Sequence, residues 1–460
     1  MQLPEVFVDR MRRLLGADVE RFLGSYDLPL RRGVRANTLK TDQARLREAF
    51  GALLESAPFA QHSFYLDSPH KAGADPLFHA GAYYMQEPSA ASAVTVLNPL
   101  KGERILDLCA APGGKSTQIA AALQGDGLLW SNEYVKNRAR ILEQNIERMG
   151  VRNAVVSSAD SAQLAQRLQG FFDGVLVDAP CSGEGMFRKE PEALTCWSEE
   201  NVRMCAARQR EILQNAADMV RPGGRLVYST CTFAPEENEC TVAWLLAARP
   251  DLEPLTVDVS FGCAGLPYET VAGFDETVQA GRYQPTACRR IFPYHGGEGH
   301  FIAAFRRRED AAGGVTLPYV YPSADAAVKD AQALYANCFT DEPYGVAVRM
   351  GDVVRLLPHG LPDLKGCGVL SAGVLLADIK KGRVEPCHAV YMAADAAACR
   401  RVVSLGKQDP LARAFLHGEE IPVTVDNGFT AVAIEGVVCG FGKVSGGRLK
   451  NRYPKGLRLL

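Results

Sequence analysis

The sequence predicts an α/β protein whose central part is a mostly parallel, doubly wound sheet. From residue 97 onward, short apolar runs alternate with helical patterns, which is typical of consecutive βαβ units. The first run, residues 104–108, is followed by the small-residue turn Ala111-Pro-Gly-Gly114 and by a helical pattern over 116–123. Such sheets bind ligands outside the carboxyl ends of their strands, so acids and thiols that follow these runs are candidate site residues.

The other elements of the central part follow in chain order. Residues 135–149 predict an amphipathic helix that stops at Gly150. Pro235-Glu-Glu is expected to open another helix, because its acids suit the helix dipole. Further strands are expected at 128–130, 154–156, 173–178, 225–229 and 299–305, with a long helix at 198–220. This order predicts one domain over residues 91–308.

The first 90 residues are expected to form an N-terminal accessory segment, rich in helix and mixed in structure. Apolar residues at helical spacing over 4–23 predict a helix that packs into a core. Residues 31–40 carry four basic side chains and no acidic one. A solvated edge strand and a phosphate-binding stretch explain this composition equally well.

Two smaller units are expected after the central domain. Residues 306–314 are charged and then small, as in a linker, and the alternation of strand and helix is lost beyond them. We expect a linker and a small mixed domain over 309–390 and a β-rich domain over 391–460. Residues 440–458 contain six basic side chains, two aromatic rings and no acid. Basic side chains beside rings that can stack on bases favour RNA contact over a frayed tail.

Composition narrows the class of protein. The 460 residues have a formal net charge of -2, so any contact with nucleic acid must come from local basic patches. Thirteen cysteines without a Cys-x-x-Cys pair argue against a zinc ribbon or a disulfide framework and fit a reducing compartment. We find no apolar run of membrane-spanning length and no signal-peptide pattern at the start. We therefore expect a cytoplasmic protein with no metal site, and nothing calls for a dimer.

Three classes of ligand compete for the turn at 111–114. A P-loop needs a first glycine where this chain has Cys109, and the dinucleotide fingerprint Gly-x-Gly-x-x-Gly is not filled. S-adenosylmethionine needs only small residues and free backbone groups. Glu133 follows the second apolar run, where an acid can bind a ribose diol. The turn therefore favours S-adenosylmethionine.

Two cysteines follow strands of the same predicted sheet. Cys181 lies three residues after Asp178, and Cys231 follows the run at 225–229. A thiolate that adds to carbon 6 of cytosine activates carbon 5 towards a methylsulfonium, provided that N3 is protonated or hydrogen-bonded. A base must later remove the carbon-5 proton so that the thiol can leave. Two thiols and an acid around one cofactor turn match these requirements.

These motifs resemble the Nop/Sun family of RNA cytosine-5 methyltransferases, and most of all its bacterial RsmF-like branch. The resemblance rests on Asp107-Leu-Cys-Ala-Ala-Pro-Gly-Gly-Lys115, Asp178-Ala-Pro-Cys-Ser-Gly183 and Ser229-Thr-Cys-Thr-Phe233. Weaker matches extend it over most of the chain: 35–40, 83–89, 297–301 and 442–458. The resemblance implies a class I, Rossmann-like methyltransferase domain and a PUA-like RNA-binding module at the C-terminus.

The family's functional residues can be carried over by matching position. Cys231 would be the nucleophile, Cys181 would help expel the methylated product, and Asp178 would contact the cytosine near N3. Glu133 would take the ribose hydroxyls and Asp160 the adenine amine, although a surface acid explains Asp160 as well. The implied S-adenosylmethionine site comprises Cys109, Ala110, Ala111, Pro112, Gly113, Gly114, Lys115, Glu133, Asp160 and Asp178. Arg188 and Lys189 either hold a backbone phosphate or lie in a solvated loop.

The expected function is therefore formation of 5-methylcytidine in RNA. The substrate is expected to be 16S rRNA or the small ribosomal subunit, on the overall resemblance alone. Transfer RNA is the alternative substrate. A non-catalytic ribosome-assembly factor and a P-loop ATPase are the alternative classes, disfavoured by the thiols with Asp178 and by Cys109 respectively.

Overall fold

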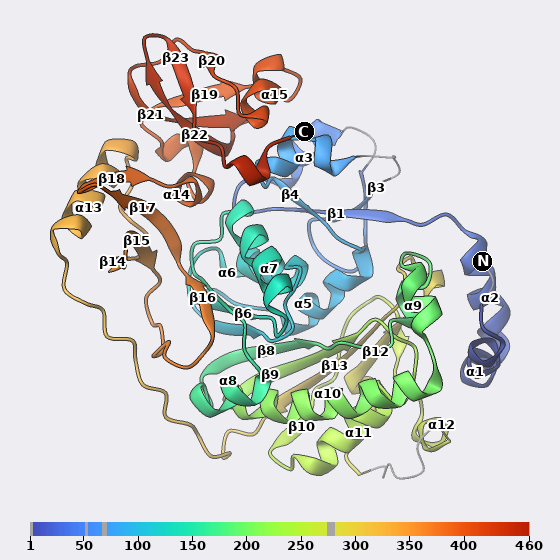
Figure 1. The fold of residues 1–460 in the computed structure, drawn as a ribbon. Helices are drawn as coiled ribbons and strands as arrows, with labels where there is room; N and C mark the ends of the chain where they lie inside the picture. Colours follow the sequence, from blue (N-terminus) through green and yellow to red (C-terminus); the bar gives the residue numbers. More distant parts are fainter. Residues whose placement is uncertain (1–2, 51–53, 67–70, 274–280, 460) are drawn as a thin grey trace.

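A computed structural model describes residues 3–50, 54–66, 71–273 and 281–459 (Figure 1). Its centre is a ten-stranded sheet, counted over these residues, in the order β11-β12-β13-β9-β8-β5-β6-β7-β16, with β10 paired to β13. Strands β5 to β9 run parallel to one another, and the outer strands of the sheet pair in antiparallel fashion. The predicted α/β class and the parallel core of the sheet are confirmed.

The central elements lie close to their predicted positions. The strands are β5 Arg104–Asp107, β6 Leu128–Asn132, β7 Ala154–Ser157, β8 Phe172–Asp178, β9 Val220–Thr230, β10 Leu252–Pro254, β11 Cys263–Ala264, β12 Cys288–Ile291 and β13 His300–Arg307. The helices are α5 Ser92–Leu97, α6 Gly114–Leu123, α7 Lys136–Arg148, α8 Ser161–Arg167, α9 Pro191–Cys196, α10 Glu199–Met219, α11 Glu239–Ala248 and α12 Tyr268–Ala272. One expectation is wrong: residues 235–238 form a turn, and α11 begins only at Glu239.

Helices cover both faces of this sheet (Figure 1). Successive strand residues point to opposite faces, so Ile105 packs with the core under α5, α6 and α7, and Leu106 packs with the core under α8, α10 and α11. On β6, Leu129 packs in the same core as Ile105, and Trp130 packs in the same core as Leu106. Burial on both faces explains why these strands read as continuous apolar runs.

In the described residues, the N-terminal segment contains four α-helices and a four-stranded sheet. Its elements are α1 Glu5–Leu15, α2 Val19–Gly24, β1 Arg32–Ala36, α3 Gln43–Phe50, β2 Leu54–Ser56, β3 Ser63–Leu66, α4 Pro76–His79 and β4 Tyr83–Met85. The apolar stripe of α1 and α2 is core, as predicted: Phe7 and Phe22 are buried against Phe187, Phe233 and Phe292 of the central domain.

In the basic stretch at 31–40 the edge-strand interpretation is wrong and Arg35 is buried, whereas Arg32 is exposed. Strand β1 lies between β3 and β4 and is not an edge strand. Arg35 is 2% exposed, and its Nη2 donates to the carbonyl oxygen of Gly114 and to Oγ1 of Thr117, each at 2.8 Å. Arg35 therefore holds the start of α6 through these hydrogen bonds, and its guanidinium group is not available to a phosphate.

The chain after residue 308 forms two further sheets. The first sheet has the order β14-β15-β17-β18, and the second has the order β19-β21-β22-β23-β20. Their elements are α13 Ala326–Cys338, β14 Val346–Met350, β15 Val353–Leu357, β16 Val369–Ala372, β17 Val374–Lys380, β18 Arg383–Pro386, α14 His388–Met392, β19 Val402–Leu405, α15 Pro410–His417, β20 Ile421–Pro422, β21 Gly428–Ile434, β22 Val437–Ser445 and β23 Arg448–Asn451. Strand β16 leaves this pattern and pairs with β7, which extends the central sheet.

The C-terminal stretch is folded into the second of these sheets. Its aromatic rings are not available to RNA bases, which corrects one basis of the sequence argument: Phe441 stacks on Tyr391 at 4.5 Å, and Tyr453 packs against Phe415. Basic side chains such as Lys443 and Arg448 are exposed. This domain shares one hydrophobic core with the N-terminal sheet, and the two lie side by side in Figure 1.

Candidate active site

The carboxyl ends of the five parallel strands converge on a cavity of about 1000 Å³. Cys109 follows β5, Glu133 follows β6 and Asp160 lies just beyond β7. Asp178 ends β8 and Cys231 follows β9. All five line the cavity, so the structure brings these predicted residues together at one edge of the sheet.

The loop from β5 to α6 contributes only part of its length to this cavity. Cys109 and Ala111 line it, whereas Ala110, Pro112, Gly113, Gly114 and Lys115 are not among the lining residues. Gly113 adopts a φ of +116°, and a Cβ there would lie 3.1 Å from Cδ1 of Leu142 on α7. The turn therefore requires glycine both for its backbone conformation and for the close approach of α7.

Two carboxylates border the cavity on the next two strands. Glu133 is buried, and its Oε1 accepts the backbone N–H of Val135 at 2.9 Å while Oε2 lies 3.5 Å from Nη1 of Arg138. Asp160 is exposed and accepts the backbone N–H of Ala162 at 2.8 Å, which caps α8. The cap alone accounts for an acid at position 160, so only its place at the cavity favours a ligand-binding role.

Asp178 stands at the centre of a buried polar group. Its Oδ2 lies 2.7 Å from Nζ of Lys115, its Oδ1 accepts Oγ–H of Ser229 at 2.7 Å, and Nε2 of His300 lies 3.7 Å from Oδ1. Burial would raise the pKa of Asp178, but the charge of Lys115, the interaction with His300 and the two hydrogen bonds outweigh burial and lower it. Asp178 is therefore ionised at neutral pH.

The two predicted thiols are in contact. Sγ of Cys181 lies 3.2 Å from Sγ of Cys231, and both cysteines line the cavity. The hydrogen bond with Cys231, followed by burial, raises the pKa of the Cys181 thiol well above its usual range. Cys181 therefore retains its proton and can donate an S–H hydrogen bond to Cys231.

Sequence reasoning assigned no role in the site to Ser229, His300 and Glu237. Ser229 holds Asp178, and His300 contributes a buried Nε2 that has no hydrogen-bond partner among the described residues. Glu237 is fully buried and accepts the backbone N–H of Ser182 at 3.0 Å. Ser229 and His300 lie within motifs that the sequence already singled out, which was the available signal. Glu237 lies in the Pro235-Glu-Glu motif, which the sequence analysis interpreted only as the start of a helix.

The donor set of the cavity fits S-adenosylmethionine. Its apolar lining includes Val135 and Ala159, and Glu133 and Asp160 provide carboxylates at the tips of two adjacent strands. A cavity with apolar walls and two carboxylates suits a ligand that combines a ring system with hydroxyl and amino groups.

In the described part of the chain, no group of three or more His, Cys, Asp or Glu side chains is arranged to hold a metal ion. None of the helices described combines the length and hydrophobicity that a membrane crossing requires.

Four sequence families match successive parts of the chain. Residues 3–88 match the N-terminal domain of 16S rRNA methyltransferase RsmF, and 94–306 match 16S rRNA methyltransferase RsmB/F. Residues 335–393 match the first C-terminal domain of RsmF rRNA methyltransferase, and 403–459 match the PUA domain of methyltransferase RsmF. The predicted PUA-like character of the C-terminus is thus confirmed.

Whole-chain relatives and solved structures agree with these matches. The ribosomal RNA small subunit methyltransferase F of Cronobacter sakazakii is 32% identical over 99% of this chain and 96% of its own, and that of Klebsiella pneumoniae is 33% identical over the same shares. A methyltransferase homologue from Pyrococcus horikoshii superposes with a TM-score of 0.58 at 30% identity, over 66% of this chain and 95% of that one. NSun6 from P. horikoshii shares the fold, with a TM-score of 0.55 at 22% identity over 67% of this chain and 99% of that one.

Proposed function

The chain belongs to the RsmF family of ribosomal RNA small subunit methyltransferases, and from this premise we propose that it methylates carbon 5 of a cytosine in 16S rRNA. The observation that carries the choice of carbon 5 is the contact between Cys181 and Cys231 beside the ionised Asp178. Methylation of a ring nitrogen or a ribose hydroxyl needs no thiol, because those atoms are already nucleophiles. Carbon 5 of cytosine becomes nucleophilic only after addition at carbon 6.

The cofactor would be held at the tips of β5, β6 and β7. Glu133 would accept the ribose hydroxyls and Asp160 the adenine amine, and both residues border the same cavity as Cys109 and Ala111. Bound S-adenosylmethionine supplies an electrophilic methyl group. The thiols border this cavity as well, so cofactor and target base would meet at Cys231 and Asp178.

The first chemical step is addition of Cys231 to the base. Its sulfur forms a bond to carbon 6, the ring electrons move towards carbon 5, and the proton that the thiol gives up is gained at N3. Nζ of Lys115, which Asp178 holds in place, stabilises negative charge developing near Cys231. The carboxylate of Asp178 accepts a hydrogen bond from the protonated N3. Because Asp178 is ionised, it acts as this acceptor and does not itself supply the proton.

Cys181 is suited to the elimination that follows methylation. The hydrogen bond with Cys231 is the largest cause of its raised pKa, and that bond weakens once the sulfur of Cys231 is bonded to carbon 6. Cys181 then loses its proton to solvent more readily, and the resulting thiolate can take the proton from carbon 5. The released electron pair restores the double bond between carbons 5 and 6, the bond from carbon 6 to sulfur breaks, and Cys231 regains the proton of N3.

The target base must leave any stack before this chemistry can occur, because carbon 6 is not accessible within a helix. The exposed basic side chains of the C-terminal domain, among them Lys443, Arg448 and Lys450, are placed to bind the surrounding RNA backbone. Transfer RNA is the alternative substrate, and no residue described here distinguishes it from ribosomal RNA.

The decisive experiment compares three cysteine variants on unmodified RNA. Purified protein, labelled S-adenosylmethionine and small-subunit rRNA from cells that lack the gene are combined, and products are mapped by mass spectrometry. Cys231→Ala should form neither 5-methylcytidine nor a covalent adduct, whereas Cys181→Ala should accumulate a methylated protein–RNA adduct. Cys263→Ala removes an exposed thiol outside the cavity and should behave as wild type.

Each outcome of that experiment has a distinct meaning. An adduct in the Cys231 variant would exchange the roles of the two thiols. A mark lost from transfer RNA, with ribosomal RNA unchanged in the deletion strain, would keep the chemistry and change the substrate. No change in either RNA would favour the non-catalytic assembly factor.

A further inference from the structure

The two thiols of the candidate site are held at close range by the segments that carry them. Cys181 follows β8, Cys231 follows β9, and these strands are parallel neighbours in which Asp178 pairs with Ser229. Beyond the strands, three hydrogen bonds of 2.8 Å join the same two segments: Oγ of Ser182 with Oγ1 of Thr232, the backbone N–H of Gly185 to the carbonyl oxygen of Cys231, and the backbone N–H of Phe233 to Oε2 of Glu184. The two segments are therefore joined both before and after the thiols.

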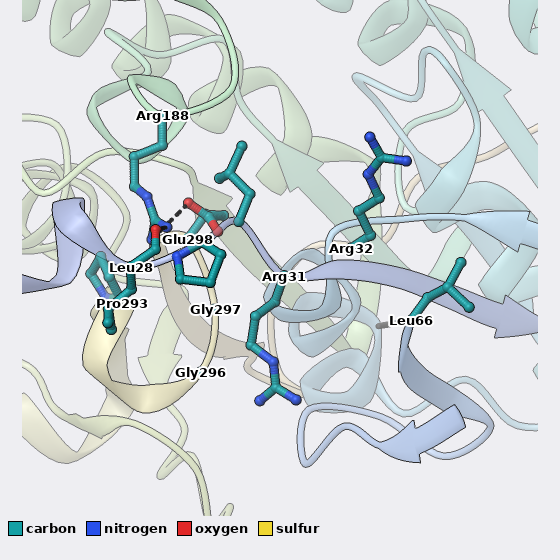
Figure 2. Close-up of a pocket in the computed structure, with 11 residues that line it drawn as sticks. Leu28, Arg31, Arg32, Leu66, Arg188, Pro293, Gly296, Gly297 and Glu298 are labelled. Atoms are coloured by element: carbon teal, nitrogen blue, oxygen red, sulfur yellow. Dashed lines mark hydrogen bonds and ion pairs between the residues drawn. The ribbon is translucent and has the colours of Figure 1, made fainter. Parts of the chain in front are cut away.

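The loop that carries Cys181 is also anchored at its far end. In Figure 2, Arg188 points towards Glu298 beside a smaller cavity of about 570 Å³. The two side chains form an ion pair of 3.4 Å, and Nη2 of Arg188 donates to the carbonyl oxygen of Leu28 at 2.5 Å. The side chain of Arg188 is only 10% exposed, which corrects the expectation that it lies in a solvated loop or holds a phosphate. Cys181 therefore lies in a loop that is fixed at both ends.

The distance between the thiols is close to the distance that a disulfide requires. Sγ of Cys181 lies 3.2 Å from Sγ of Cys231, and a disulfide bond is about 2.05 Å long, so an approach of about 1.2 Å would complete the bond. Neighbouring strands lie about 4.8 Å apart, which is within the range of about 4.4–6.8 Å between the Cα atoms of a disulfide. Rotation of the two side chains can supply the approach while the backbone stays paired.

A small oxidant can reach this pair. Both cysteines are half-buried, and both line the cavity of about 1000 Å³. The charge of Lys115 and a thiolate at Cys231 attract each other, which favours attack by that sulfur. Hydrogen peroxide is small and uncharged, so it can enter a cavity of this size and meet Cys231.

We propose that hydrogen peroxide joins Cys181 and Cys231 in a disulfide, and that this bond reversibly stops methyl transfer. The disulfide removes both the sulfur that adds to carbon 6 and the base that takes the carbon-5 proton. The arrest of methyl transfer rests on the proposed function, whereas the disulfide itself depends only on the two thiols. Disulfides that form in a reducing compartment are usually transient and serve catalysis or redox sensing.

The oxidation has two steps. The thiolate of Cys231 attacks one oxygen of the peroxide, the O–O bond breaks, and the departing hydroxide takes up the proton that the thiol gave up, which leaves a sulfenic acid and water. The sulfur of Cys181 then displaces the hydroxyl group of the sulfenic acid, and the proton of Cys181 leaves with that group as a second water. The two sulfurs together lose two electrons, and these electrons reduce the peroxide.

Oxidation of Cys231 makes the second step easier. The hydrogen bond with Cys231 is the largest cause of the raised pKa of Cys181, and that bond weakens once the partner sulfur carries an oxygen. Cys181 then gives up its proton more readily and becomes a better nucleophile.

The second thiol also protects the first. A sulfenic acid without a thiol beside it can be oxidised further to a sulfinic acid, which thiol reductants do not reverse. At 3.2 Å, Cys181 is close enough to intercept the sulfenic acid first. Oxidised wild type should therefore recover on reduction, and a variant without Cys181 should not.

The first test detects the bond itself in the full chain. Purified wild type, Cys181→Ser, Cys196→Ala and Cys263→Ala are treated with limited peroxide, free thiols are blocked with iodoacetamide, and unreduced peptides are mapped by mass spectrometry. Wild type should contain a cross-link between Cys181 and Cys231 that dithiothreitol removes, whereas Cys181→Ser should carry sulfinic acid at Cys231. Cys196 is an exposed thiol that lines the same cavity and Cys263 is an exposed thiol outside it, so both of these variants should form the cross-link.

The second test follows activity and cofactor binding. Oxidised wild type should lose nearly all methyl transfer to unmodified small-subunit rRNA and should regain it after dithiothreitol. Its affinity for S-adenosylmethionine, measured by calorimetry, should not change, because the disulfide leaves the tips of β6 and β7 as they were. A lost affinity would mean that peroxide unfolds the site, which would refute a local switch.

The outcomes separate this inference from the proposed function. If wild type forms the cross-link but methylates no RNA when reduced, the proposed function fails and the disulfide stands. Sulfinic acid at Cys231 of wild type without a cross-link, or a cross-link from Cys231 to Cys196, would refute the pairing. A cross-link that leaves methyl transfer unchanged would refute the switch. Recovery of the Cys231 thiol by dithiothreitol in Cys181→Ser would refute protection.

Discussion

Replacing Glu237 by glutamine should make the protein more stable in alkali while leaving it unchanged in acid. Glu237 is fully buried, and its Oε2 accepts hydrogen bonds from the backbone N–H of Ser182 at 3.0 Å and from Nε2 of Gln209 at 2.8 Å. Burial raises the pKa of Glu237 from 4.5 to about 7. Glutamine keeps an oxygen for the two donors and carries no charge at any pH.

The sign and the size of the effect follow from linkage. The unfolded chain releases the carboxyl proton near pH 4.5 and the folded chain only near pH 7, so the free energy of unfolding falls as the pH rises between these values. A difference of about 2.5 pKa units corresponds to about 3 kcal/mol. The variant avoids this loss, so its stability relative to wild type should rise by about 3 kcal/mol between about pH 4 and about pH 8.

Equilibrium urea unfolding at the two pH values measures this difference directly. Other buried groups that titrate near neutrality, such as Asp107 and Lys40, affect both proteins equally and cancel in the comparison. Glu200→Gln on the exposed side of α10 is the matched control and should show the same difference from wild type at both pH values. A constant difference for Glu237→Gln across the range, or a loss of stability at high pH, would refute the reasoning.

Two further predictions concern the cofactor loop and the acid of the site. Arg35→Met should reduce stability by about 3 kcal/mol, because it leaves the buried oxygens of Gly114 and Thr117 without their donor. It should also weaken S-adenosylmethionine binding in calorimetry, with no change in the salt slope of RNA binding; a changed slope with normal stability would mean that Arg35 contacts RNA. Lys115→Met should shift the acid limb of the pH–rate profile to higher pH, because the charge of Lys115 helps to keep the pKa of Asp178 low. An unshifted acid limb in single-turnover assays would show that the limb belongs to another group.

Much of the candidate site could be predicted because it depends on local patterns. Parallel strands end at the same edge of a sheet, so a thiol or acid directly after each of five apolar runs must lie near the others. Glu133, Asp178 and Cys231 reach one cavity for this reason. Their roles in the reaction remain proposals, as does that of Asp160, whose cap of α8 is an alternative explanation.

Other residues could not be assigned because their partners lie far away in the chain. The residues around Arg35 are typical of a surface strand. Its burial is explained only by the contact between β1 and the start of α6, where Arg35 donates to Gly114. Phe441 is in a segment rich in glycine and basic residues, yet its ring stacks on Tyr391, fifty residues earlier. Strand β16 pairs with β7 through backbone groups, which leave no mark in the side-chain pattern.

The sequence by itself determined the class of fold, the edge of the sheet at which the candidate site lies and several of the side chains that meet there, because these depend on periodicity and on the residues that follow each strand. Only the tertiary structure decided that Sγ of Cys181 lies 3.2 Å from Sγ of Cys231 and that Lys115 is held by Asp178. Each of these depends on contacts between segments far apart in the chain. The distances in such contacts are set by how whole elements pack, which no local pattern records.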